Sequence, residues 1–143
     1  MGSSGPETIN YTSIFGRVVA ALRAETRLNQ IDFAAACHMK QSTLARIESG
    51  KNTATIDHIM RIERTFYNLD KIDDPGDLVL LVYECCRKLV KRGVRIRYGK
   101  LKDEQFVLPV NRLDAVAAMV VLEWEKSEEE GGDFFDESDE NES

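Results

Sequence analysis

The sequence lacks any long apolar run, any disulfide framework and any secretory signal. No stretch of about eighteen apolar residues occurs, so we expect no helix that spans a membrane. Cysteine is scarce, with three residues of which Cys85 and Cys86 are adjacent, and this odd count indicates a reducing compartment. The N-terminus has neither a basic start nor an apolar core, and Met-Gly-Ser-Ser-Gly is typical of a recombinant leader. We therefore expect residues 1–10 to be a disordered leader.

The usual signatures of an enzyme or metal site are also missing. Cys37 and His38 have no second pair at zinc-ligand spacing, so no metal site is expected. Residues 93–100 only superficially resemble a phosphate loop, because Leu101 stands where Ser or Thr would bind magnesium. A redox-sensing role for Cys85 and Cys86 would require thiols of lowered pKa. The chain is therefore not expected to be an enzyme or to need a cofactor.

The negative charge is confined to one end of the chain. The net charge of −6 is the sum of +1 over residues 1–70, +2 over residues 71–126 and −9 over residues 127–143. The body is therefore basic, and the acidic total does not exclude nucleic-acid binding. Residues 127–143 cannot bury enough apolar surface to order themselves and are predicted to be a disordered acidic tail. This tail could solubilise the protein, compete with DNA for a basic face, or bind a basic partner.

The rest of the chain is predicted to be mainly α-helical and to divide at a polar Pro-Gly connector, residues 71–77. Residues 11–70 have helical apolar spacing, as in Phe15, Val19 and Leu22. Asn29 and Thr55 are suited to start helices, and Gly50 is suited to end one. The expected elements are a first helix through Phe15–Leu22, short helices over 30–36 and 41–48, and a fourth helix after Thr55. The two short helices are joined by only Cys37–Lys40, so they must cross steeply, as in a helix-turn-helix.

Three stretches carry a family resemblance in register: Phe15–Arg23, Leu28–Ala34 and Gln41–Lys51. Over about Tyr11–Leu69 the chain resembles the Cro/C1-type helix-turn-helix of the XRE family, which implies a four- to five-helix DNA-binding domain over residues 11–70. The resemblance implies that Gln30 anchors a phosphate and that the helix from Gln41 is the recognition helix. The sequence departs from the family pattern at Arg27 and His38, which stand where the family often has a glycine with positive φ. A third departure is Lys40, which replaces the usual Ser or Thr cap.

The resemblance also assigns individual residues. Gln side chains suit adenine and Arg suits guanine, so groove contacts are expected from the recognition helix. Flanking side chains are expected near phosphates. Arg23 and Glu48 match the family's buried ion pair, whose role is structural. The expected DNA-binding residues are Gln30, Lys40, Gln41, Ser42, Thr43, Arg46, Lys51 and Asn52. For each of them alone, a solvated surface position is the alternative.

Residues 78–126 are predicted to form a helix–β-hairpin–helix unit. Asp77 would cap a helix to about Arg92, and Val94–Tyr98 would pair with Phe106–Val110 as a hairpin. Asn111 would cap the last helix, with Asp114 in a capping-box position. Each helix has one apolar stripe: Leu78, Leu81, Val82, Cys85, Leu89 and Val90 in the first, and Leu113, Val116, Ala117, Val120, Val121 and Trp124 in the second. So small a unit gains from pairing, so we expect a homodimer through residues 78–126; the alternative is packing within the monomer.

A basic cluster accompanies this unit and could contact flanking phosphates through a wing-like hairpin, or could be a solvated face. It comprises Arg87, Lys88, Lys91, Arg92, Arg95, Arg97, Lys100 and Lys102.

The sequence therefore predicts a sequence-specific regulator of transcription that binds double-stranded DNA, most simply a homodimeric repressor on a palindromic operator. The resemblance implies a cytoplasmic protein. The alternative is an antitoxin-like or antagonist module whose C-terminal part, Leu78–Trp124 or the tail, binds another protein.

Overall fold

The computed structural model describes residues 8–98 and 110–129 of the chain. A three-residue strand, β1 (Thr8–Asn10), leads into the long helix α1 (Tyr11–Thr26). Three shorter helices follow: α2 (Gln30–Ala36), α3 (Gln41–Ser49) and α4 (Ile56–Asn68). The remaining elements are α5 (Asp77–Lys91), β2 (Arg95–Arg97) and α6 (Val110–Glu129). The expectation of a mainly helical chain is confirmed.

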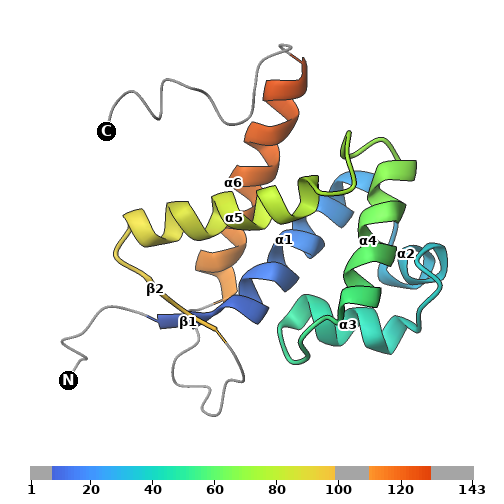
Figure 1. Ribbon diagram of the computed structural model, residues 1–143, viewed down its shortest axis with the longest axis horizontal. Coiled ribbons are helices and arrows are strands. Elements are labelled where there is room, and N and C mark those ends of the chain that lie inside the picture. Colours follow the sequence, from blue (N-terminus) through green and yellow to red (C-terminus); the bar gives the residue numbers. More distant parts are fainter. Residues whose placement is uncertain (1–7, 99–109, 130–143) are drawn as a thin grey trace.

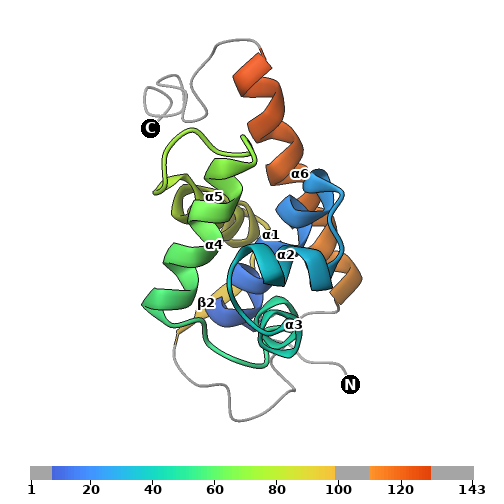
Figure 2. The same cartoon turned by 90° about the vertical axis from the view of Figure 1, so that its right-hand side faces the viewer.

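Helix α1 is the central element of the molecule. Helices α2, α3 and α4 lie on one side of it, and α5 and α6 cross on the other side (Figure 1). Figure 2 shows the α2–α4 side facing the viewer, with α3 at its lower edge and α6 rising above the rest. Helix α1 contacts α3, α5 and α6. The helices before and after the loop at residues 71–76 therefore both pack against α1.

One cluster of buried apolar side chains runs through all of these helices. Phe15, Val19 and Leu22 of α1 are buried as expected, and Phe33 of α2 stacks on Phe66 of α4 with 4.8 Å between ring centroids. The two C-terminal stripes also enter this cluster, with one exception: Val90 is 55% exposed. These stripes therefore pack within the single chain, as the alternative to dimerisation supposed, and they do not themselves provide a dimer face.

Helix ends in the N-terminal part follow the local signals. The side chain of Asn29 accepts a hydrogen bond from the backbone N–H of Asp32 at 2.8 Å, and that of Thr55 accepts one from His58 at 3.1 Å. Gly50 ends α3 with φ of +82°. Arg27 and His38 have φ of +66° and +58°, the left-handed conformation that glycine adopts most easily. The chain therefore has the turns of a helix-turn-helix without the glycines.

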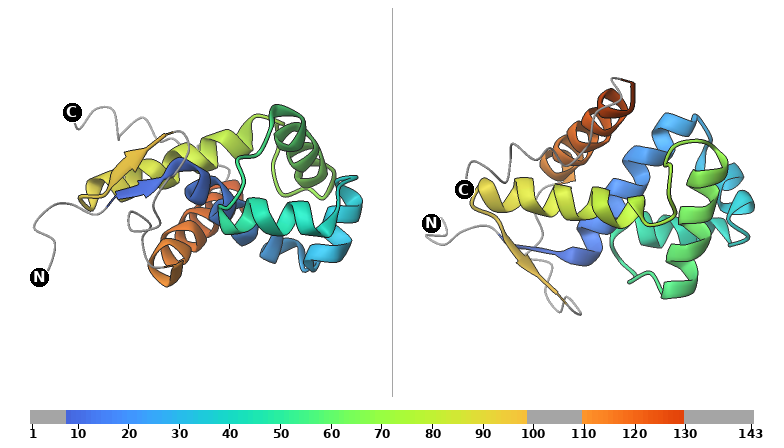
Figure 3. Two further views of the ribbon diagram at one scale, coloured as in Figure 1. Left: turned by 90° about the horizontal axis from the view of Figure 1, so that it is seen from below. Right: turned by 45° about the horizontal axis from the view of Figure 1, so that its top comes forward.

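The expected leader is wrong for its last three residues. β1 pairs in parallel with β2, so that Ile9 lies opposite Ile96 (Figure 3). Ile9 is fully buried, and the Asn10 side chain accepts the backbone N–H of Thr12 at the start of α1. An apolar residue and a helix cap within three positions explain why this segment is ordered.

The expected C-terminal unit also differs in detail. The strand expected at Val94–Tyr98 is present as β2, but its partner in the described residues is β1. Residues 106–109 lie outside the described residues, and Val110 already begins α6, so Asn111 is inside the helix and is not its cap. Helix α6 continues through residues 127–129, the first three positions of the expected acidic tail; the other tail residues lie outside the described part.

Asp77 does not cap α5 from outside but occupies its first position. Its carboxylate accepts hydrogen bonds from the backbone N–H groups of Asp73 and Asp74, at 3.0 and 2.9 Å. The carboxylate therefore closes the connecting loop onto the helix, because the loop offers it two N–H donors. No helix in the described part of the chain is both long and apolar enough to cross a membrane.

Candidate nucleic-acid interface

The helix expected to read DNA presents a polar face to solvent. Gln41, Ser42 and Arg46 of α3 are exposed, whereas Leu44 and Ile47 on its other side are buried in the core. Thr43 is half-buried and so is less accessible than its neighbours. The helix begins at Gln41 even though Lys40 makes no side-chain cap. Its exposed side chains therefore stand in the register that the family resemblance implies.

The flanking candidates also lie on this surface. Lys40 precedes α3, and Lys51 and Asn52 follow it; all three are exposed. The backbone N–H groups of Lys51 and Asn52 both donate to the carbonyl oxygen of Arg46, at 3.0 and 3.2 Å. This closes the turn after α3 and holds the two side chains next to the helix end.

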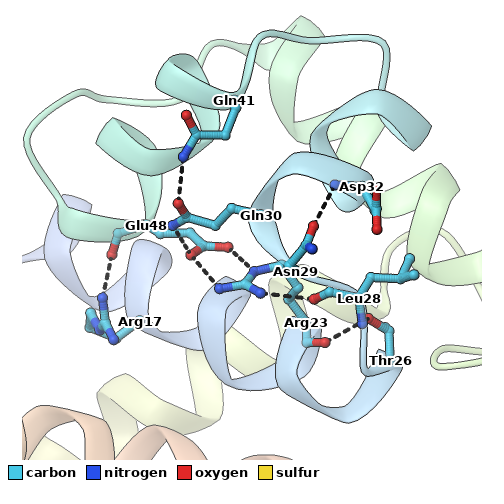
Figure 4. A network of polar contacts seen from close by, with 9 residues as sticks. All are labelled: Arg17, Arg23, Thr26, Leu28, Asn29, Gln30, Asp32, Gln41 and Glu48. Carbon is cyan, nitrogen blue, oxygen red and sulfur yellow. Dashed lines mark hydrogen bonds and ion pairs between the residues drawn. The ribbon is translucent and has the colours of Figure 1, made fainter.

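A polar network behind this surface joins α1, α2 and α3 (Figure 4). The Glu48 carboxylate is 3% exposed and accepts the Nε and Nη2 groups of Arg23 at 2.7 and 3.1 Å. Arg23 also donates to the carbonyl oxygen of Leu28 at 2.9 Å. The expected Arg23–Glu48 pair is thus present, with its charges satisfied by hydrogen bonds on both sides. Such a buried pair resists loss of either partner, since one uncompensated charge would remain.

Gln30 extends the network to the exposed surface. Its Nε2 donates to Glu48 at 2.8 Å, and its Oε1 accepts Nε2 of Gln41 at 2.8 Å (Figure 4). Gln41 is the first residue of α3, so its side chain is oriented by Gln30 in the absence of any ligand. Preorganised contacts of this kind lower the entropic cost of binding.

The sequence pattern predicts no role for Arg17 and a capping-box role for Asp114, whereas the structure brings these two residues together. Arg17 of α1 donates through Nη1 to the carbonyl oxygen of Glu48 at 3.0 Å, near the C-terminal end of α3. Its Nε and Nη2 groups pair with the Asp114 carboxylate of α6 at 2.5 and 3.3 Å. In the sequence, the sign of this contact was that Arg17 and Asp114 are each a single charged residue within an apolar segment. We call this three-residue arrangement the Arg17 clamp.

Close backbone packing accompanies the Arg17 clamp. A Cβ atom added to Gly16 would lie 2.1 Å from the carbonyl oxygen of Ile47, so α1 and α3 touch at a point where no side chain fits. The C-terminal end of α3 therefore packs directly against α1 at Gly16. Arg17 binds the same end of α3, and Asp114 of α6 holds Arg17 in place.

The thiols are not suited to redox sensing. Burial raises the pKa of Cys85 to about 12 and that of Cys86 to about 11, and burial also raises the pKa of Cys37. At neutral pH all three are protonated, and a protonated thiol is a poor nucleophile. Within residues 8–98 and 110–129, no three His, Cys, Asp or Glu side chains gather in a way that could hold a metal ion.

Comparison with protein families adds an independent finding. Residues 19–66, about a third of the chain, match the family model described as helix-turn-helix. Comparison with curated proteins and with solved structures gave no match. The matched residues include α2, α3 and their turn, together with the Arg23–Glu48 pair and most of the exposed polar residues described above. Residues 19–66 are therefore similar to a helix-turn-helix of the Cro/C1 type in the XRE family, and this similarity supports a DNA-binding regulator of transcription in general.

Proposed function

We propose that this regulator is a homodimeric repressor that binds a palindromic operator. The observation that carries the proposal is the exposed polar face of α3, whose first residue is already oriented by Gln30. An exposed, rigidly supported helix of this kind fits the major groove. Two recognition helices about one helical turn apart would cover the operator and exclude RNA polymerase.

Base recognition is proposed for the exposed side chains of α3. Arg46 would read guanine by two parallel hydrogen bonds, and Gln41 would read adenine in the same manner. Ser42 and Thr43 would add shorter-range contacts, Thr43 with its smaller exposed area. Gln30, Lys40, Lys51 and Asn52 would bind phosphates and so fix the register of the domain on the duplex.

Dimerisation is proposed through the outer face of α6. Nine of the ten residues from Leu113 to Leu122 are apolar, and only one face of this stretch enters the core. The other face presents Ala115, Ala118 and Leu122 to solvent at helical spacing, with Leu122 54% exposed. A helix that is apolar on all sides is normally buried on all sides. A second copy of the chain is the occupant that would also supply the second half-site.

The test is a selection of genomic DNA fragments by the purified full-length protein, read across a salt series. A recovered palindrome with a steep salt dependence is expected, because a dimer releases counterions at two sets of phosphates. Failure to enrich any sequence would contradict the proposal and would favour the alternative, an antitoxin-like or antagonist module whose C-terminal part binds another protein.

Oligomeric state is tested separately by sedimentation. Ala118→Glu would place a charge in the outer face of α6 and should convert a dimer to a monomer. Ala24→Glu is the matched control, because Ala24 is an exposed helical alanine on α1. A wild-type protein that sediments as a monomer at micromolar concentration, with or without operator, would contradict the homodimer.

A further inference from the structure

A shallow apolar groove lies away from α3, between α5 and the β1–β2 ribbon. Its volume is about 390 Å³. Val79, Tyr83 and Val90 form its wall on α5, and Tyr11, Ile96 and Tyr98 form the opposite wall. Tyr11 and Tyr98 are in ring contact at 5.6 Å, so the second wall is largely aromatic. Helix α5 and the β1–β2 ribbon lie beside one another in Figure 3.

The groove exposes more large apolar surface than a solvated face needs. Tyr83 is 58% exposed, Val90 55% and Tyr98 70%. Val79, Tyr83 and Val90 repeat at helical spacing on one side of α5, so the exposed residues form a continuous patch. A contiguous exposed apolar patch marks a binding site more often than a single exposed residue does.

The charge beside this groove is of one sign. Residues 85–98 contain six Lys or Arg and no Asp or Glu, and Arg87 lines the groove itself. The nearest acid before this stretch, Glu84, is 5% exposed and is paired with both Arg87 and Lys88. A second copy of this basic surface would be repelled, so an acidic occupant fits better than a copy of the same face.

We propose that the groove binds the acidic C-terminal segment of its own chain, residues 132–137, with Phe134 and Phe135 in the apolar groove. Residues 127–143 contain nine acids and no Lys or Arg, and these two phenylalanines are the only large apolar side chains among them. The segment therefore matches the groove twice, through adjacent aromatic rings and through charge. Ring-on-ring contacts of this kind add to simple area burial.

The length of the chain permits this docking. Lys88 of α5 contacts Glu123 of α6 at 3.3 Å, so α6 crosses α5 six residues before the last described residue, Glu129. Those six residues add about 9 Å of helix. Phe134 lies five residues beyond Glu129, and five extended residues span about 17 Å. The extended span exceeds the helical overhang by about 8 Å, so the segment can turn back from the end of α6 towards the C-terminal part of α5.

Docking would have a consequence that rests on the proposed function. Arg95 and Arg97 flank the groove residue Ile96 in β2 and are exposed. A docked acidic segment would lie near these cations and would compete with DNA phosphates for them. Tethering gives such a competitor a millimolar effective concentration, so weak docking suffices. The segment would then act as a built-in restraint on DNA binding at low salt.

The first test is independent of DNA and uses the full-length chain. Backbone amide resonances are compared between the wild type and the double variant Phe134→Ala, Phe135→Ala, with Ser138→Ala, Ser143→Ala as the matched tail control. We expect shifts at amides of residues 79–98 and none in α2 and α3 for the phenylalanine variant only. Unchanged resonances in residues 79–98 would overturn the proposal. Wild-type groove shifts that change on dilution would also overturn it, in favour of a second copy as the occupant.

A groove variant provides the reciprocal measurement. Val90→Ser alters an exposed position, so the fold should be retained. The reference sample is a chain cut after Glu129, mixed with the free segment 132–137 at micromolar concentration. In the Val90→Ser variant, the resonances of residues 132–137 should move towards their positions in this reference sample. Finally, the phenylalanine variant should bind operator about three- to tenfold more tightly at low salt, with the gain lost at high salt. Groove shifts without this gain would support docking and overturn its regulatory role.

Discussion

Arg46 is the residue on which the proposed base recognition depends most. It is exposed on α3, and its own carbonyl oxygen accepts the backbone N–H groups of Gly50, Lys51 and Asn52, so its backbone is fixed while its side chain is accessible. We predict that Arg46→Ala costs about 1–3 kcal/mol of specific binding and relaxes preference at one base position. Competition binding with operators that vary at each position checks this.

The matched comparison is Lys51→Ala. Lys51 is proposed to contact a phosphate, so its loss should weaken binding to all sequences about equally and lower the salt slope by about one. Equal loss of specific and nonspecific binding in Arg46→Ala would show that Arg46 also contacts only a phosphate.

Glu63 of α4 is a residue whose charge opposes folding. It is 9% exposed, and its Oε2 atom has no hydrogen-bond partner among residues 8–98 and 110–129. Burial, and secondarily the nearby Asp77 carboxylate, raise the pKa of Glu63 above its usual 4.5. The protonated form is therefore favoured in the folded state, and its contribution to stability is present below pH 4.5 and lost as pH rises through the folded pKa.

We therefore predict that Glu63→Gln raises the free energy of unfolding at pH 7 relative to the wild type, and that the difference shrinks towards pH 4. Urea unfolding at both pH values measures it. Glu25→Gln, at an exposed position of α1, is the control that should show no such pH-dependent gain. A Glu63 variant that is less stable at pH 7 would show that the ionised carboxylate has a favourable partner.

At the scale of secondary-structure elements, the Arg17 clamp connects α6 to α3. Arg17 is 25% exposed and Asp114 39%, so their pairing is partly screened by solvent. We predict that Arg17→Ala costs about 1–2 kcal/mol of stability, because both the ion pair and the bond to the Glu48 carbonyl are lost. It should also weaken operator binding, since the C-terminal end of α3 loses its support.

Asp114→Ala should have the same effect on DNA binding in weaker form, because Arg17 keeps its bond to Glu48. Lys71→Ala is the matched control, because Lys71 pairs with Glu125 of α6 at 3.9 Å. Amide exchange in residues 46–50 reports the mechanism directly, and it should rise in the Arg17 and Asp114 variants only. Unchanged exchange would contradict a positioning role.

Elements whose signals are local were predictable from the sequence. Asn29 and Thr55 bond to backbone groups three residues away, so their caps can be recognised without knowing the rest of the fold. The candidate recognition-helix residues were assigned from the family resemblance, which also rests on a short segment of the sequence. The family match at residues 19–66 covers this local part.

Contacts between distant segments were not predictable. β2 pairs with β1 across more than eighty residues of sequence. A three-residue strand with one apolar residue between two arginines gives no indication of its partner. Asp114 is 97 residues from Arg17, and the favourable capping-box spacing suggested a local role for it instead. Such long-range pairing depends on how the helices pack around the core. The residue pattern within one segment carries no information about that packing.

At the scale of the whole molecule, the N-terminal and C-terminal helices stabilise each other through α1. The apolar stripes of α5 and α6 that could have served a separate dimerisation unit are buried against it. A regulator built in this way cannot move its C-terminal helices without affecting the support of α3. Partner binding at α6 and DNA binding at α3 are therefore expected to be energetically coupled.

The last described turn of α6 determines where the chain can be shortened. Trp124 is 6% exposed, and its Nε1 donates to the carbonyl oxygen of Lys71 at 3.2 Å, so the helix must be intact through this residue. Residues 130–143 carry seven of the tail's nine acids. We predict that truncation after Glu129 changes the free energy of unfolding by less than about 1 kcal/mol and tightens DNA binding at low salt.

Truncation after Glu123, which removes Trp124 as well, should instead cost about 3–5 kcal/mol, because a large core side chain and its hydrogen bond are both lost. Thermal unfolding of the two truncated chains and the full-length chain measures the difference. A chain cut after Glu129 that unfolds as easily as one cut after Glu123 would show that residues 130–143 belong to the core. A chain cut after Glu129 that is stable but binds DNA no more tightly at low salt would show that the acidic segment does not compete with DNA.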